Sequence, residues 1–253
     1  MRRWRNLVLG LALIFAPLGC GSADSARPIR TSPPNNPPQV VTPSNTTPGD
    51  PPKGITPSRG DDPPVGPQAT APPVLTPAQQ QSLLEEIKQL GGLVKLADGR
   101  VSGISLADSL ATDDVLQRVG GMPDLGFLML GNSQISGEGL YHLRALTTLE
   151  KLSLANTAVD DAGLAHLRSL PQLLHLDLYH TEVTDAGLAH LAVLTELEEL
   201  RLQDTRITDE GLKHLAGMKK LKMLRLRGTL VTQEGVDALK KSLSEGARVY
   251  TSF

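Results

Sequence analysis

Four of the six histidines recur at one register and are the residues best suited to bind a metal ion. His142, His166, His190 and His214 are each 24 residues apart. If successive 24-residue units stack about 4.8 Å apart, the imidazoles form a column in which two neighbouring rings could share a zinc ion. A linear column rarely gives tetrahedral geometry, and no Cys or carboxylate recurs with it. We therefore interpret these histidines as repeat positions and expect no metal site and no cofactor.

Nucleophilic catalysis has no support in the sequence. The chain has one Cys, no Gly-x-Ser-x-Gly elbow and no glycine-rich phosphate loop. Acidic pairs at Asp113-Asp114, Asp160-Asp161 and Asp209-Glu210 could suggest calcium, but they lack the alternating ligand spacing of a calcium-binding hand. They stand where helices are expected to begin, and a carboxylate there stabilises the helix dipole. We expect no catalytic residue and no enzymatic activity.

The single Cys, Cys20, follows a segment typical of an export signal. Three arginines within residues 1–6 precede an apolar run over residues 7–15, which is too short to span a bilayer. The end of this segment resembles a bacterial lipoprotein signal, in which a small residue, here Gly19, precedes a Cys that is diacylated and becomes the new N-terminus. One departure is Pro17, which stands where such signals usually have Leu.

This resemblance predicts a signal peptide over residues 1–19 and lipidation of Cys20, and so a membrane-anchored lipoprotein of the cell envelope, on its periplasmic or surface side. Two or three acyl chains would anchor it stably, since each buried CH₂ contributes about 0.8 kcal/mol. The alternative is ordinary cleavage downstream, for example after Ser25, which would remove Cys20 and leave a secreted or periplasmic protein. Arg2-Arg3 is also compatible with twin-arginine export.

The composition of residues 20–77 predicts a proline-rich linker. Of the 19 prolines, 16 lie between residues 21 and 77, spaced by Ser, Thr, Asn, Gly and Asp, and no aromatic residue falls in that stretch. Such a segment cannot bury enough apolar surface to offset its ordering entropy, so we expect a disordered tether with a maximum reach of about 180 Å. Its proline pairs could instead bind a proline-reading domain, but a spacer is the simpler interpretation.

The rest of the chain repeats a 24-residue unit. One leucine position recurs at Ile104, Leu128, Leu152, Leu176, Leu200 and Leu224. The best preserved copy, residues 173–194, follows the template L-x-x-L-x-L-x-x-T-x-V-T-D-x-G-L-x-H-L-x-x-L. Its Leu-x-Leu alternation predicts a short strand, and the later leucines line one face of a short helix. A single unit cannot bury its leucines, so the units must stack around a continuous aliphatic core.

This template resembles the leucine-rich repeat family, specifically the strand-plus-helix kind seen in ribonuclease inhibitor and in bacterial GLAHL-type repeat proteins. The resemblance covers residues 101–250 strongly and residues 82–100 weakly. It implies an α/β fold, a leucine-rich repeat solenoid with short parallel strands on the concave side and short helices on the convex side.

One repeat position departs from that family. Thr or Ser stands where the family usually has Asn or Cys, at Ser109, Ser133, Thr157, Thr181, Thr205 and Thr229. We expect these hydroxyls to hydrogen-bond turn backbone that would otherwise be buried without a partner. A recurring glycine, such as Gly187, is expected to let neighbouring backbones approach closely.

Both ends of the solenoid need covers, because its terminal units would otherwise expose apolar edges. Residues 78–100 are the predicted N-terminal cap, with a helix over 80–90 and the start of a hairpin, whose strands 93–96 and 101–106 are joined by a turn at Asp98-Gly99. Residues 101–253 are the predicted leucine-rich repeat domain with its C-terminal cap. In that cap, the last helix is expected to continue to Leu243, and residues 247–250 to form a closing edge strand.

The outward strand residues would form the concave face of the solenoid and are the candidate partner-binding residues. Their aromatic, Met and Arg content is that of interface hot spots, and we expect Phe127, Met129 and Tyr179 to be exposed. The full set is Phe127, Met129, Lys151, His175, Asp177, Tyr179, Glu199, Arg201, Gln203, Arg225 and Arg227.

The charge distribution bears on the class of partner. A net charge of -2 gives no pull toward nucleic acid. Residues 101–210 hold 6 Lys plus Arg and 17 Asp plus Glu, whereas residues 211–253 hold 9 and 3, so an acidic body precedes a basic end. The sequence therefore predicts a non-catalytic module, displayed outside the cytoplasm, that binds a protein or envelope partner. The alternative is a structural envelope protein whose solenoids associate with one another.

Overall fold

A computed structural model describes residues 73–252 of the chain. These residues belong to one compact unit, Asp62–Phe253. The predicted signal peptide, Cys20 and the linker up to residue 72 lie outside the described residues. Within residues 73–252, none of the helices has both the length and the apolar composition needed to cross a bilayer.

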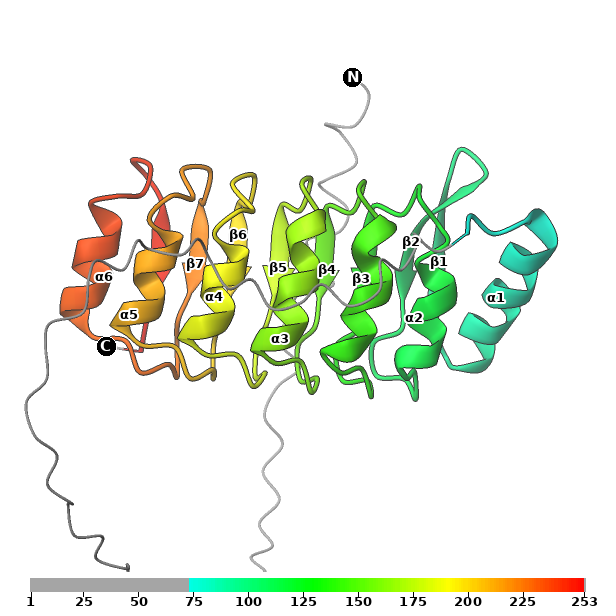
Figure 1. Ribbon diagram of the computed structural model, residues 1–253, viewed down its shortest axis with the longest axis horizontal. Coiled ribbons are helices and arrows are strands. Elements are labelled where there is room, and N and C mark those ends of the chain that lie inside the picture. Colours follow the sequence, from blue (N-terminus) through cyan, green and yellow to red (C-terminus); the bar gives the residue numbers. More distant parts are fainter. Residues whose placement is uncertain (1–72, 253) are drawn as a thin grey trace, which may run out of the picture. The chain divides into compact units, whose positions relative to one another are not determined.

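One sheet runs along the whole unit, with its strands in sequence order (Figure 1). The first two strands form an antiparallel hairpin and every later pair is parallel. The leucine positions of successive repeats pair directly, as in Leu152 with Leu176 and Leu176 with Leu200. The strands are β1 (Leu93–Ala97), β2 (Arg100–Ser105), β3 (Phe127–Met129), β4 (Lys151–Ser153), β5 (His175–Asp177), β6 (Glu199–Arg201), β7 (Met223–Arg225) and β8 (Arg248–Tyr250).

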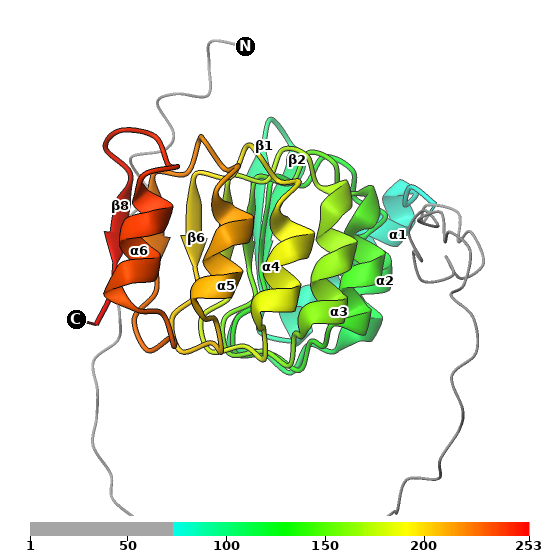
Figure 2. The ribbon, with the colours of Figure 1, turned by 60° about the vertical axis from the view of Figure 1, so that its left-hand side comes forward.

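Short helices cover one face of this sheet, which we call the helix side (Figures 1 and 2). Several of them are wholly or partly 3₁₀ helices, since the 24-residue repeat leaves only one or two helical turns between strands. The helices are α1 (Pro77–Gln89), α2 (Asp113–Val119), η2 (Glu138–Ala145), α3 (Asp161–Leu164), η3 (Ala165–Ser169), α4 (Asp185–Leu191), α5 (Asp209–Leu212), η4 (Lys213–Leu215) and α6 (Gln233–Lys240).

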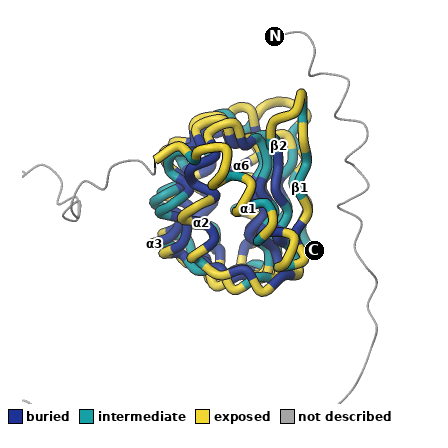
Figure 3. The backbone as a smooth tube through the Cα atoms, turned by 90° about the vertical axis from the view of Figure 1, so that its right-hand side faces the viewer, coloured by how far each residue is buried: buried dark blue, intermediate teal, exposed yellow. Residues whose placement is uncertain are grey.

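The core lies between the strands and the helices. Viewed along the stack, buried backbone faces the interior and exposed backbone faces outward (Figure 3). Leu176 on the strand side and Leu188 and Leu191 on the helix side are at most 1% exposed, and the equivalent positions of the other repeats are buried as well. The structure is the leucine-rich repeat solenoid that the sequence predicts.

The Thr and Ser ladder bonds to turn backbone, as expected. Each hydroxyl donates to the carbonyl three residues earlier at 2.5–2.8 Å, as Thr181 does to Leu178. The residue before each ladder position has a positive φ, which only Gly, Asn and Asp adopt readily. These residues are Asp108, Asn132, Asn156, His180, Asp204 and Gly228. His180 is the one member of another type, and its φ is 52°.

The recurring glycines make room mainly for a carboxylate rather than for backbone. A Cβ built on Gly187 would lie 2.4 Å from Oδ1 of Asp161 in the preceding repeat. That carboxylate accepts hydrogen bonds from Thr184 of the next repeat, and the same arrangement recurs at three other junctions. Gly163 is the exception, because a Cβ there would lie 2.4 Å from the Cα of Gly137.

The helices and strands expected at the two ends are present with altered boundaries. Helix α1 begins at Pro77 rather than at residue 80, because Thr76 and Gln79 form a capping box there. The backbone N–H of Leu75 already donates to the carbonyl of Gly121 at 3.1 Å, so contacts with the fold start before residue 78. At the other end β8 closes the sheet as expected. The expectation that the last helix reaches Leu243 is wrong, since α6 ends at Lys240.

Candidate functional site

The outward side chains of the strands form one continuous surface, which we call the strand face. The register places most of the candidate residues in two rows across the sheet. One row contains Phe127, Lys151, His175, Glu199, Met223 and Arg248. The second contains Met129, Ser153, Asp177, Arg201, Arg225 and Tyr250. Just beyond the strand ends lie three more candidates, each two residues after a member of the second row: Tyr179, Gln203 and Arg227.

The β1–β3 end of the strand face is less exposed than the sequence suggested. Phe127 and Met129 are half-buried, and of the three apolar candidates only Tyr179 is exposed, at 37%. The Phe127 ring lies against the backbone of Gly103, where a Cβ would come within 1.9 Å of it. The Lys95 ammonium lies 5.4 Å from the centre of the same ring. The missing side chain of Gly103 thus leaves room for the tip of the aromatic ring on the neighbouring strand.

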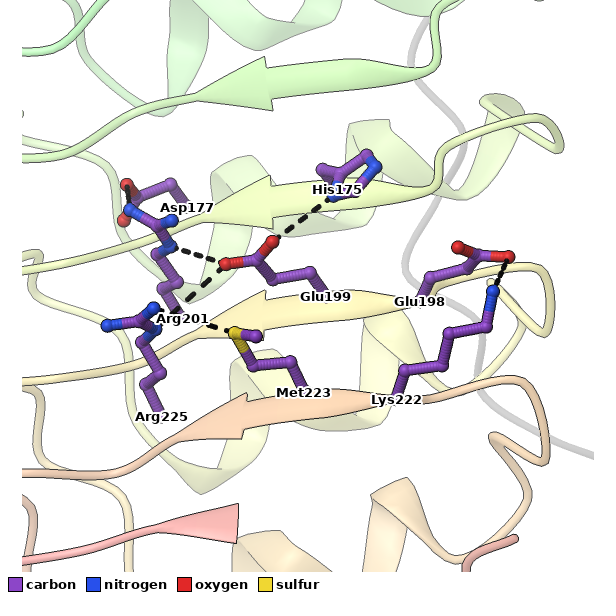
Figure 4. A network of polar contacts seen from close by, with 8 residues as sticks. All are labelled: His175, Asp177, Glu198, Glu199, Arg201, Lys222, Met223 and Arg225. Atoms are coloured by element: carbon purple, nitrogen blue, oxygen red, sulfur yellow. Dashed lines mark hydrogen bonds and ion pairs between the residues drawn. The ribbon is translucent and has the colours of Figure 1, made fainter. Parts of the chain in front are cut away.

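Four charged residues and a histidine form a connected network at the centre of the strand face (Figure 4). Arg201 donates through Nε to Glu199 Oε1 at 2.8 Å and lies 3.5 Å from Asp177 Oδ2. His175 Nδ1 lies 3.4 Å from the other oxygen of Glu199, and Arg225 Nε lies 4.0 Å from Oε1. Arg201 is thus held by Glu199 on its own strand and by Asp177 on the neighbouring strand, which fixes its guanidinium in place.

The two carboxylates of this network have opposite pKa shifts. The hydrogen bond with His175, and then the hydrogen bond and charge of Arg201, lower the pKa of Glu199 to about 2 against the opposing effect of burial. Burial raises the pKa of Asp177, although the backbone N–H of Tyr179 donates to its Oδ1 at 3.0 Å. Glu199 therefore stays ionised to a lower pH than Asp177 does.

Tyr179 stands at the edge of the network. Burial, followed by the nearby Asp204 carboxylate, raises the pKa of its phenol. Its ring also contacts that of His180, with 5.9 Å between the ring centres. The phenol is thus a neutral hydrogen-bonding group on an exposed ring, a combination common at protein interfaces.

Strand β8 brings Arg248 and Tyr250 onto the strand face, and the sequence had identified them only as part of a closing strand. Both are exposed, and the Arg225 guanidinium lies 5.5 Å from the centre of the Tyr250 ring. The signal that could have found them is the alternation around Val249, which pairs with the buried Leu224 and so turns its two neighbours outward.

The histidine column lies on the helix side, and two of its members pack against one tyrosine ring. His142 and His166 both contact the edge or face of Tyr141 at 5.5 Å between ring centres, and the Arg144 guanidinium lies 3.6 Å from that ring. Burial, then the charges of Arg144 and His142, lower the pKa of His166. Within residues 73–252 no group of three or more His, Cys, Asp or Glu is arranged to hold a metal ion.

A cleft of about 430 Å³ lies between α1 and the β1–β2 hairpin. Apolar Leu84, Leu96 and Met122 line it together with Arg100 and Asp124. The two charged side chains face each other at 3.5 Å, so the cleft offers no net charge to a ligand. The strand face, on which Tyr179, Arg227, Arg248 and Tyr250 are exposed, is the stronger candidate site.

One family comparison agrees with the repeat that the sequence predicts. A model of the "Leucine Rich repeat" family matches residues 193–216, one repeat of the solenoid. Among solved structures, the chain is similar to internalin C2 of Listeria monocytogenes strain 4b F2365, with 20% identity, coverage of 61% of this chain and 82% of that chain, and a TM-score of 0.44. It is also similar to the internalin InlF of the same strain, with 16% identity, 60% and 48% coverage, and a TM-score of 0.42. No curated protein matches the chain.

Proposed function

We propose that this chain is a non-catalytic protein-binding module displayed outside the cytoplasm, anchored in a membrane of the cell envelope through lipid on Cys20. Its binding surface is the strand face, and its partner is a protein of the envelope or its surroundings. The observation that carries the proposal is the alignment of aromatic, Met and Arg side chains in adjacent rows on one side of the sheet. These residue types are enriched at the centres of protein interfaces.

The network around Arg201 supports a binding role. Its side chain is 16% exposed and is held between Glu199 and Asp177. A side chain that is already ordered loses little rotamer freedom when a partner binds. Tyr179 and Arg227, at the strand ends, add exposed groups of the kinds that interfaces favour.

Site-specific photocrosslinking tests the proposal. A photoreactive phenylalanine at Tyr179, on the strand face, should form a discrete protein adduct on intact cells. The same residue at Ala186, which is exposed on the helix side, is the matched control and should form none. Equal adducts at the two positions, or adducts only at Ala186, would remove the strand face from consideration.

Self-association is a second candidate function, and the edge of the sheet favours it. Strand β1 is an edge strand, and its Leu93 and Leu96 are 73% and 59% exposed. Unpaired strand edges with apolar side chains can pair with another copy. Sedimentation equilibrium of the purified chain separates the candidates, because self-association raises the apparent mass with concentration and Leu93→Lys abolishes that rise. A constant monomer mass would reject this second function.

A further inference from the structure

We propose that the partner of the strand face is an acidic polypeptide segment, and that it docks on three arginines and a tyrosine at the C-terminal end of the sheet. This inference rests on the proposed function and names the chemistry of its partner. We call the group formed by Arg225, Arg227, Arg248 and Tyr250 the cationic end. Arg225 and Tyr250 are register partners on β7 and β8, Arg248 lies two residues before Tyr250, and Arg227 lies two residues after Arg225.

The cations of this group are not balanced by the carboxylates around them. Glu199 is the nearest acid, but Arg201 already takes its Oε1 at 2.8 Å, and Arg225 Nε lies 4.0 Å from that same oxygen. Arg225 Nε is buried without a hydrogen-bond partner. Within residues 73–252, Arg227 and Arg248 form no ion pair, and both are exposed. The other nearby acids on this face are Asp177, which Arg201 also contacts, and Asp204 beside Tyr179.

Most lysines of residues 211–253 are paired with a carboxylate. Lys222 pairs with Glu198 at 2.6 Å, Lys220 pairs with Glu196, and Lys213 pairs with Glu210 at 2.6 Å. Apart from Lys219, which donates to the carbonyl of Ser242, and the exposed Lys241, the unpaired positive charge of residues 211–252 lies on the strand face. Guanidinium groups bind carboxylates through two parallel hydrogen bonds, so arginines placed side by side suit a run of acidic side chains.

The surroundings favour a short peptide over an extended polyanion. Residues 101–210 carry 17 acidic and 6 basic side chains, which would repel a polyphosphate chain or an anionic membrane lying along the solenoid. A peptide can place acidic residues on the cationic end and other residue types elsewhere. An extended peptide advances about 3.3 Å per residue and neighbouring strands lie about 4.8 Å apart, so two or three acidic residues span the three arginines. Tyr250, under the Arg225 guanidinium, offers such a peptide an aromatic surface as well.

The experiment measures binding of a fluorescein-labelled peptide with three consecutive glutamates to the full chain, by fluorescence anisotropy. The same peptide with glutamine in place of each glutamate is the ligand control. The test variant is Arg225→Gln, Arg227→Gln, Arg248→Gln. The matched protein control is Lys213→Gln, Lys240→Gln, Lys241→Gln, which removes the same charge from exposed positions on the helix side.

The proposal expects the glutamate peptide to bind and the test variant to weaken that binding about tenfold or more, with the helix-side variant changing it less than about twofold. If the melting temperature shows that the test variant is destabilised, the double variant Arg227→Gln, Arg248→Gln replaces it. That variant leaves the contacts of Arg225 intact and should still weaken binding severalfold.

Four results would overturn the proposal. The glutamine peptide could bind as tightly as the glutamate peptide, or the helix-side variant could weaken binding as much as the test variant. Polyphosphate or phosphatidylglycerol vesicles could also bind the cationic end more tightly than the peptide, which would assign it to a phosphate surface. Protein adducts at Tyr179 together with failure of the glutamate peptide would leave the proposed function standing and reject only this inference.

Discussion

The carboxylate of Asp161 accepts two hydrogen bonds from Thr184, which stands one repeat further along the chain. The backbone N–H of Thr184 lies 2.8 Å from Oδ1 and its hydroxyl lies 2.6 Å from Oδ2. Asp161 also begins α3, so one side chain both stabilises a helix N-terminus and joins two helices. The equivalent pairs are Asp113 with Ser136, Asp185 with Thr208 and Asp209 with Thr232.

Asp161→Ala is expected to lower the free energy of unfolding by about 1–3 kcal/mol, because Thr184 loses both hydrogen bonds to a charged acceptor. Asp114→Ala is the control. It also removes an acid from a helix first turn, but Asp114 is exposed and makes no hydrogen bond to a described residue, so its effect should stay within about 0.5 kcal/mol. Urea unfolding measures the free energy of unfolding of both variants. Equal losses would mean that Asp161 stabilises the chain only through the helix dipole and not through its hydrogen bonds with Thr184.

Gly187→Ala should destabilise the chain by about 1–3 kcal/mol, because the added methyl would overlap the Asp161 carboxylate and force the two repeats apart. A Cβ at Gly217 meets no atom within 4 Å, so Gly217→Ala should leave the unfolding midpoint nearly unchanged. Thermal melts followed by circular dichroism compare the two variants. A stable Gly187→Ala protein would show that the glycine is not needed for the close approach.

Stability should depend on Glu199 at acidic pH. Its folded pKa of about 2 lies below the ordinary value of 4.5, so its ionised form stabilises the fold above pH 4.5 and that contribution is lost as the pH falls toward 2. Asp177 acts in the opposite direction, because its raised pKa favours the protonated form in the folded chain. Glu199→Gln should therefore reduce the loss of stability over this pH range, by about 1 kcal/mol for a partly solvated ion pair.

Urea unfolding at several pH values measures this effect. Glu210→Gln is the control, since its pair with Lys213 is exposed and should leave the pH dependence as in the wild type. Parallel stability curves for Glu199→Gln and the wild type would contradict the expected role of Glu199.

The double variant Tyr179→Ala, Arg225→Ala should abolish the binding of a protein partner found by crosslinking, while the melting temperature stays within a few degrees of the wild type. Both side chains lie on the strand face, and neither belongs to the leucine core. Val193→Ala with Lys213→Ala makes a similar change at exposed positions on the helix side and should leave binding intact. Unaltered binding by the first double variant would exclude the strand face.

Lipidation of Cys20 predicts that the mature N-terminus carries acyl chains and that the protein partitions with membranes. Cys20→Ser should move it to the soluble fraction, whereas Ser22→Ala, two residues away, should not. Mass spectrometry of the mature chain gives the deciding measurement. An unmodified N-terminus downstream of residue 20 would favour ordinary cleavage and a secreted or periplasmic protein.

The fold could be predicted because a repeated sequence repeats its physical constraints. Leu176 and Leu178 recur in every unit, so the inward face of the sheet and the period of the stack follow from one well-preserved copy. The hydrogen bonds of the repeated Thr and Ser hydroxyls could be predicted as well, since a buried Thr beside a turn has few partners other than the turn backbone. The caps were visible in outline, but the capping box at Thr76 moved the start of α1, and α6 ends before Leu243.

The exposure and charge state of the side chains on the strand face could not be predicted from one repeat at a time. Whether Phe127 is exposed depends on Gly103, a full repeat earlier, and the charge state of Glu199 depends on His175 and Arg201 on two strands. The sequence places these residues on the same face. The side-chain geometry across the sheet decides which charges pair with each other. The unpaired charge at Arg227 and Arg248 could therefore be recognised only in the structure.

The glycine at position 137 has a mechanical consequence. Where the other repeats place an aspartate that joins the next helix, Gly137 has no side chain, and Asp160 instead caps its own helix by accepting from the N–H of Gly163 at 2.9 Å. In a solenoid each repeat is held only by its neighbours, and at this junction the two side-chain hydrogen bonds that Thr184 makes to Asp161 have no counterpart. A force that separates these two repeats is therefore resisted by backbone packing in place of the carboxylate, since a Cβ at Gly163 would lie 2.4 Å from the Cα of Gly137.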